Sequence, residues 1–135
     1  MRNVNDYDKV DIKATSQTLT DSYADLGSEI NVRGYNTLKL YLGIDINSSN
    51  DVQVKALAKL LENATEEYEL DTQTVSSGVT QVDKQYFEVN YDADGYQTIQ
   101  IDVTGCYVIQ LQVQAGTLGD PAGAITSAYG ILVNR

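Results

Sequence analysis

The chain has 135 residues, with nine basic and nineteen acidic side chains and a formal net charge of −10. This length fits a single domain. The acidic balance argues against nucleic-acid binding and against anionic membrane surfaces, because both require clustered Lys and Arg. The chain has no histidine, which excludes Ser–His and Cys–His nucleophile pairs and imidazole metal ligands.

The N-terminal residues are polar. Residues 1–9 offer only Val4 and Tyr7 as anchors, so we expect a terminal arm followed by one domain over residues 10–135. Ordering the backbone of such an arm costs roughly 1–2 kcal/mol per residue. Residues 1–9 carry too little apolar surface to offset this cost on their own. The arm is therefore expected to order against a neighbouring subunit through Val4 and Tyr7. Packing along the edge of its own domain is the alternative.

The first half of the domain alternates between apolar and polar residues. Weak runs at residues 10–14 and 26–32 precede a clear one, in which every second residue is apolar: Leu38, Leu40, Leu42, Ile44 and Ile46. Such a run predicts a strand with one buried face, and residues 47–51 then read as a polar turn. Residues 52–64 fit both a strand and a helix that begins after Asp51. The strand is favoured because both flanks are β and the opening residues suit a strand.

The second half continues this pattern. A weak strand is expected around residues 68–70, and a further strand has Phe87, Val89 and Tyr91 on one face. The Asp94-Gly95 pair after it predicts a hairpin, because it tolerates positive φ. Strands at residues 98–103 and 107–114 are separated by a reversal at Gly105. The last strand places five residues on one face: Ile125, Ser127, Tyr129, Ile131 and Val133.

About eight short strands with turns at near-regular spacing predict the fold class. The expected fold is all-β: a single-domain antiparallel β-sandwich, jelly-roll-like. Pro121, the one proline, falls in a loop and interrupts no strand.

Two acidic patterns were candidates for chemistry. Residues 90–95 resemble the first half of an EF-hand loop, but the twelfth position is Ile101, where a bidentate Glu is required, and a strand follows in place of a helix. A turn with solvated carboxylates is therefore favoured. The nineteen acids include no spacing that singles out a glycosidase pair. We expect no catalytic residue, no metal site and no cofactor, and hence no enzyme.

Other segments suggest contacts. Residues 115–124 lack the Lys of a phosphate-binding loop and form either a flexible connection or a contact loop, with Gly116, Leu118 and Gly119 as candidate contact residues. Tyr35, Tyr41, Tyr96 and Tyr107 offer faces for stacking on a sugar, although core and interface roles are favoured.

The single cysteine, Cys106, excludes an intramolecular disulfide. Cys106 lies an even number of residues before Gln110 and Gln112, which predicts that it shares their polar face of the strand. There it would be partly exposed or covered by another subunit, and we expect it to be dispensable for folding. No apolar run typical of a signal peptide occurs near the N-terminus, and a single cysteine fits a reducing cytoplasm.

The polar arm, the acidic sandwich and two segments, residues 34–42 and 101–116, resemble the small β-sandwich accessory proteins of tailed-phage virions, such as head decoration proteins. The resemblance implies a structural role on the virion after assembly in the host cytoplasm, commonly as a trimer whose arm contacts neighbours. The leading hypothesis is a non-enzymatic virion protein that binds copies of itself and other virion proteins, without nucleic-acid or membrane partners. A ligand-binding sandwich for carbohydrate or calcium is the alternative.

Overall fold

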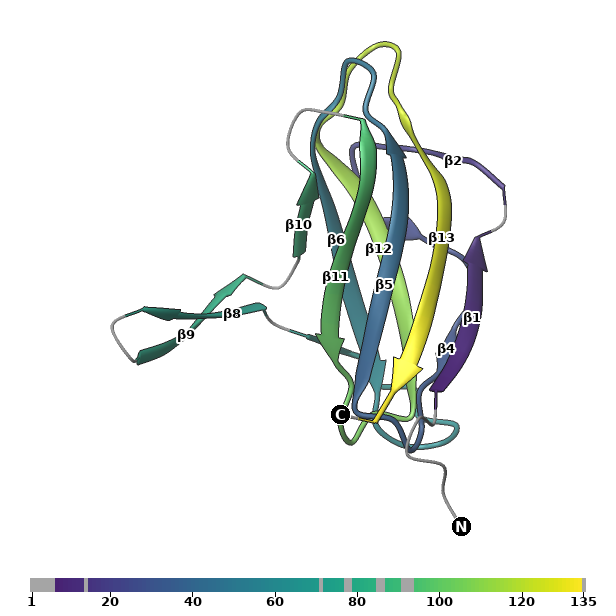
Figure 1. The fold of residues 1–135 in the computed structure, drawn as a ribbon, viewed down its shortest axis with the longest axis vertical. Helices are drawn as coiled ribbons and strands as arrows, with labels where there is room; N and C mark the ends of the chain where they lie inside the picture. Colours follow the sequence, from purple (N-terminus) through teal and green to yellow (C-terminus); the bar gives the residue numbers. More distant parts are fainter. Residues whose placement is uncertain are drawn as a thin grey trace.

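The computed structural model describes residues 7–13, 15–70, 72–76, 79–84, 87–90 and 94–134. Every regular element in these residues is a β-strand (Figure 1). Two antiparallel sheets pack against each other, so the predicted all-β sandwich is confirmed. In the described part of the chain, no helix is long and apolar enough to cross a membrane.

The first sheet has the order β1-β13-β5-β11, with a short strand, β2, also paired to β13. Its strands are β1 (Tyr7–Lys13), β2 (Gln17–Thr18), β5 (Thr37–Asp45), β11 (Gly95–Asp102) and β13 (Ala124–Val133). The C-terminal strand therefore lies inside the sheet, between β1 and β5, as the alternation at the end of the sequence predicted.

The second sheet has the order β10-β6-β12-β3, with β4 also paired to β12 and β7 to β6. Its strands are β3 (Ala24–Asp25), β4 (Ile30–Asn31), β6 (Asn50–Lys59), β7 (Tyr68–Glu69), β10 (Phe87–Asn90) and β12 (Val108–Thr117). A separate hairpin of β8 (Thr72–Ser76) and β9 (Val79–Lys84) extends to one side of the sandwich (Figure 1).

The core lies between the two sheets and follows the period of two. In β5, the leucines at positions 38, 40 and 42 are buried, while Thr37, Lys39 and Tyr41 between them are half-exposed. In β6, Val52, Val54, Ala56 and Ala58 are fully buried. The strand interpretation is thus confirmed over residues 52–59. Residues 60–64 lie in the loop that follows.

The face predicted for the last strand is wrong for Ser127, Tyr129 and Ile131, although Val133 at its end is buried. The register between β13 and β5 shifts between Ile125 and Ser127, and an extra residue in one strand moves every later side chain to the opposite face. Ala128 and Leu132 consequently point into the core, and Tyr129 is 37% exposed.

The hairpin predicted at Asp94-Gly95 is also wrong. β10 pairs with β6 in the second sheet, whereas β11 pairs with β5 in the first, so the connection crosses between sheets. Asp94 acts in this connection by accepting a hydrogen bond at Oδ1 from the backbone N–H of Ile46, at 2.8 Å. The Asp-Gly pair identified a reversal of the chain but not the partner of the next strand.

Cys106 does not lie on a polar face. It is 8% exposed and belongs to the core cluster. The residue precedes β12 and closes a tight turn in which its N–H donates to the carbonyl of Val103 at 2.9 Å, so the alternation of β12 does not extend to it. Gln110, also predicted to face outward, is buried, and its Nε2 donates to the carbonyls of Gly27 and Leu111.

The boundary of the predicted arm differs from the start of the first strand. Tyr7, Asp8 and Lys9 pair with β13 opposite Val133, Leu132 and Ile131. These three residues belong to the first sheet. Residues 1–6, including Val4, lie outside the described residues.

Candidate functional site

The loop between β12 and β13 packs against the loop between β5 and β6 (Figure 1, top). The N–H of Gly119 donates to Ser49 Oγ at 3.0 Å, and a Cβ at position 119 would overlap the backbone carbonyl of Ser48. Gly119 therefore serves a close approach within the chain. Leu118 is 40% exposed and Gly116 is exposed, so these two predicted contact residues lie at the surface.

The opposite end of the sandwich, where β1 begins and β13 ends, carries a hollow of about 530 Å³. We call it the end groove; its lining includes Arg33, Tyr35, Leu60, Leu61, Cys106 and Tyr107. Leu60 and Leu61, which follow the end of β6, are 48% and 72% exposed.

Two polar side chains of the end groove, Arg33 and Tyr35, are held by neighbours in the same chain. The Arg33 guanidinium lies 5.4 Å from the centre of the Tyr107 ring, and the Tyr35 hydroxyl donates to the Asp8 carboxylate of β1. Burial, with a smaller contribution from the Asp102 carboxylate, raises the pKa of the Cys106 thiol. The thiol is therefore neutral at physiological pH, the opposite of the lowered pKa that activates a nucleophilic cysteine.

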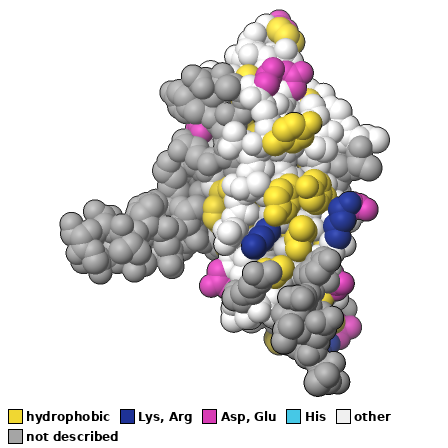
Figure 2. Space-filling view, viewed as in Figure 1, with side chains coloured by type: hydrophobic (Ala, Val, Ile, Leu, Met, Phe, Trp, Pro, Cys, Tyr) yellow, Lys and Arg dark blue, Asp and Glu magenta, His cyan; other side chains and the backbone are white. Residues whose placement is uncertain are grey.

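The outer face of the first sheet carries three tyrosines. Tyr41 and Tyr129 lie opposite each other on β5 and β13, and their rings stack with centres 4.9 Å apart and planes 10° from parallel. Tyr96 on β11 is 88% exposed. Figure 2 shows the hydrophobic side chains gathered on this face, with basic side chains on both sides. Lys9 of β1 contacts this group, with its Nζ 5.2 Å from the centre of the Tyr129 ring.

The structure separates the four tyrosines that were candidates for sugar stacking. Tyr41 and Tyr96 share the face of the first sheet, whereas Tyr35 and Tyr107 line the end groove. Tyr129 joins Tyr41 and Tyr96 on the face of the first sheet. The sequence did not identify it, because the bulge in β13 moves its side chain to the face opposite the predicted one. Its position in an alternating run was visible, but the face to which it points was not.

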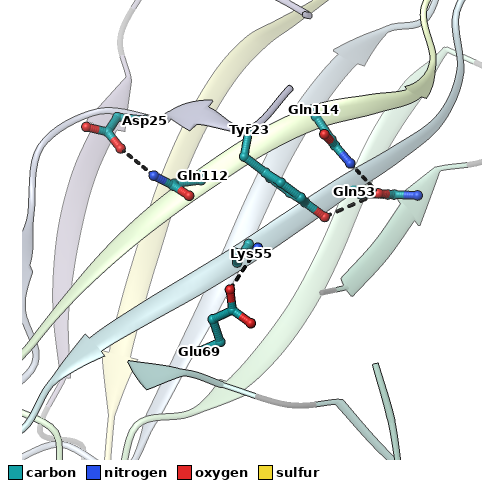
Figure 3. A network of polar contacts seen from close by, with 7 residues as sticks. All are labelled: Tyr23, Asp25, Gln53, Lys55, Glu69, Gln112 and Gln114. Atoms are coloured by element: carbon teal, nitrogen blue, oxygen red, sulfur yellow. Dashed lines mark hydrogen bonds and ion pairs between the residues drawn. The ribbon is translucent and has the colours of Figure 1, made fainter. Parts of the chain in front are cut away.

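The outer face of the second sheet is a network of paired polar groups (Figure 3). Gln53 Oε1 accepts from the Tyr23 hydroxyl at 3.2 Å and from Gln114 Nε2 at 2.8 Å. Lys55 pairs with Glu69 at 2.9 Å and lies over the Tyr23 ring, 4.4 Å from its centre. These side chains therefore satisfy one another within the chain.

Residues 90–95, which resemble the first half of an EF-hand loop, fall partly outside the described residues, which omit 91–93. Asp94 is described, and one oxygen of its carboxylate accepts the Ile46 N–H. Among the side chains that the structure does describe, no group of three or more His, Cys, Asp or Glu is placed to hold a metal ion.

No family model matches this chain, and no curated protein matches it. Its fold is similar to the crystal structure of the SPBc2 prophage-derived protein YomS. The two chains are 21% identical, the similarity covers 98% of each, and the TM-score is 0.47. The assignment of a function therefore rests on the surfaces of this chain itself.

Proposed function

We propose that this chain is a non-enzymatic structural subunit of a tailed-phage particle that acts through protein–protein contacts. The phage setting is supported by the resemblance to virion accessory proteins found in the sequence. The observation that carries the contact role is the end groove, where Leu60 and Leu61 are 48% and 72% exposed beside Arg33.

The composition of the end groove is that of a contact site between proteins. Covering an exposed leucine contributes about 1.5–3 kcal/mol, and Tyr and Arg are the residue types most enriched among those that dominate binding energy. Tyr35 and Tyr107 are already held, by Asp8 and Arg33 respectively. Their side chains therefore lose little further entropy when a partner binds.

The occupant that we propose is the N-terminal segment of a neighbouring copy. Residues 1–6 precede a strand whose Asp8 contacts Tyr35 in the wall of the end groove. Six residues reach about 20 Å when extended, far enough to leave one subunit for the next. Val4 then supplies an apolar contact from this segment, and the assembly is a homo-oligomer, with a trimer implied by the family resemblance.

Leu118 supplies a second contact at the other end of the sandwich, toward other virion proteins. It is 40% exposed and flanked by Gly116 and Gly119. The Gly119 backbone is tied to Ser49, so this loop presents Leu118 from a supported base.

The test is association of the full chain, measured by sedimentation velocity and by co-sedimentation with phage particles assembled in its absence. Leu61→Glu is expected to abolish self-association while leaving the melting temperature unchanged, because the side chain is largely exposed. Gln100→Glu is the matched control: it introduces the same charge at an exposed position of β11. The proposal would be refuted if the parent chain stays monomeric and does not co-sediment with particles. It would also be refuted if the Leu61→Glu variant associates like the parent.

A further inference from the structure

A second hollow, of about 180 Å³, lies on the outer face of the first sheet, on a different surface from the end groove. Its centre is Gly43 in β5, which lies opposite Tyr96 on β11 and Ser127 on β13. Tyr41 and Tyr129, the stacked pair, form part of the lining, and the remaining lining residues are Leu42, Gln97 and Thr98.

The hollow depends on the absence of a side chain at position 43. Glycine in the interior of a strand weakens it and marks a close approach. A Cβ on Gly43 would lie 2.6 Å from Thr126 Oγ1 and 2.8 Å from Ser127 Oγ. The β-bulge of β13 falls at these two residues, and bulges often re-aim side chains next to functional sites. The glycine and the bulge together leave a floor edged by two hydroxyl groups.

One wall of the hollow is held in place by contacts within the chain. Tyr41 and Tyr129 hold each other by stacking, and Lys9 lies over the Tyr129 ring. Tyr96 stands on the other side of Gly43, 88% exposed, with ring atom Cε1 3.4 Å from the place of the missing Cβ. The stacked pair is therefore in place before binding, and the Tyr96 ring is accessible to a ligand.

The chemistry of the lining selects the ligand. No charged residue lines the hollow, although the chain carries a net charge of −10, so the lining matches an uncharged ligand. Aromatic rings pack on an apolar face, while the hydroxyl groups of Ser127 and Thr98 exchange hydrogen bonds. A sugar ring combines a C–H face with a hydroxyl edge. The volume is below the roughly 300–1,000 Å³ of sites for drug-sized ligands, which limits the occupant to about one ring.

We propose that this hollow binds one residue of a neutral saccharide, with its C–H face on Tyr96 and its hydroxyl groups toward Ser127 and Thr98. This is a binding activity separate from the protein contacts at the end groove. A particle subunit with these surfaces makes its protein contacts at the two ends of the sandwich and presents a sugar-binding face along its side.

The probes are the methyl glycosides of glucose, galactose, mannose and N-acetylglucosamine, each tested on the full chain by saturation-transfer NMR. At least one is expected to bind and to shift the backbone amide signals of β5, β11 and β13 around Gly43. Tyr96→Ala is expected to weaken binding about tenfold, the equivalent of one aromatic contact of about 1.4 kcal/mol. Its exposure makes a folding defect unexpected.

Tyr68→Ala is the matched control, because Tyr68 is a half-exposed tyrosine on β7 of the second sheet. This control is expected to bind like the parent, and Tyr96→Ala is expected to keep the self-association of the parent. The proposal is overturned if none of the four glycosides binds. It is equally overturned if Tyr96→Ala binds as tightly as the parent, or if the shifted signals lie on another surface.

Discussion

Replacing the buried thiol tests how the turn before β12 places Cys106 in the core. Cys106 is 8% exposed, and no hydrogen bond to its Sγ occurs among the described residues. A serine hydroxyl in its place would be buried without a partner, which costs about 1–3 kcal/mol. Cys106→Ala instead removes one heavy atom, at about 1 kcal/mol. We therefore expect Cys106→Ser to be the less stable variant, although less damaged than a large-to-Ala core change of about 2–5 kcal/mol.

The assay is urea denaturation at pH 7 followed by far-UV circular dichroism, with the parent and both variants measured together. Thermal melting gives a second readout, in which 1 kcal/mol corresponds to roughly 4 °C for a domain of this size. Equal stability of Cys106→Ser and the parent would refute the burial of Cys106. It would mean that the side chain is solvated, as the alternation of residues 106–112 had suggested.

The pH dependence gives an independent check on the same burial. Because burial raises the pKa of Cys106 in the folded state, the folded chain retains this proton more tightly than the unfolded chain. The stabilisation is complete below the ordinary thiol pKa of 9.0 and is lost as the pH rises above it. The parent should therefore lose stability above pH 9 more steeply than Cys106→Ala. Parallel pH profiles for these two proteins would contradict a buried thiol.

Three further predictions concern the loops and the N-terminus. Gly119→Ala should destabilise the fold by about 1–3 kcal/mol in urea denaturation, because its Cβ would overlap the Ser48 carbonyl; an unchanged midpoint would show that the two loops separate freely. A chelator should leave the melting temperature unchanged, and a large drop would reveal a bound cation. Removing residues 1–6 should preserve the melting temperature and abolish association. Removing residues 1–9 should abolish association and also lower the melting temperature, because three residues paired with β13 are lost. Association that survives the shorter deletion would exclude the arm contact.

The sequence identified several residues that could bind a ligand or a partner, but not which of them lie together in the fold. Tyr41 and Tyr96 were recognised as possible stacking residues, yet their partner Tyr129 was assigned to the wrong group because a bulge is not visible in a pattern of alternation. Leu60 and Leu61 fell within residues 52–64, a segment for which a strand was favoured over a helix. The end of β6 at Lys59 separates these two leucines from the strand and exposes them.

The strands themselves were determined locally. Alternation in residues 38–46 and 52–58 decides which side chains can share a buried face, because successive side chains of a strand point to opposite sides. These residues form β5 and β6 with the expected faces buried. The sequence by itself therefore determined the all-β class and most of the core.

Tertiary structure decided which strands meet. The connection at Asp94 crosses to the other sheet, and the turn at Gly105 directs Cys106 inward. Gly43 becomes the floor of a hollow only because β11 and β13 bring Tyr96 and Tyr129 beside it. Alternation is a property of consecutive residues, but pairing depends on contacts between segments far apart in the chain, whose energies no local pattern records.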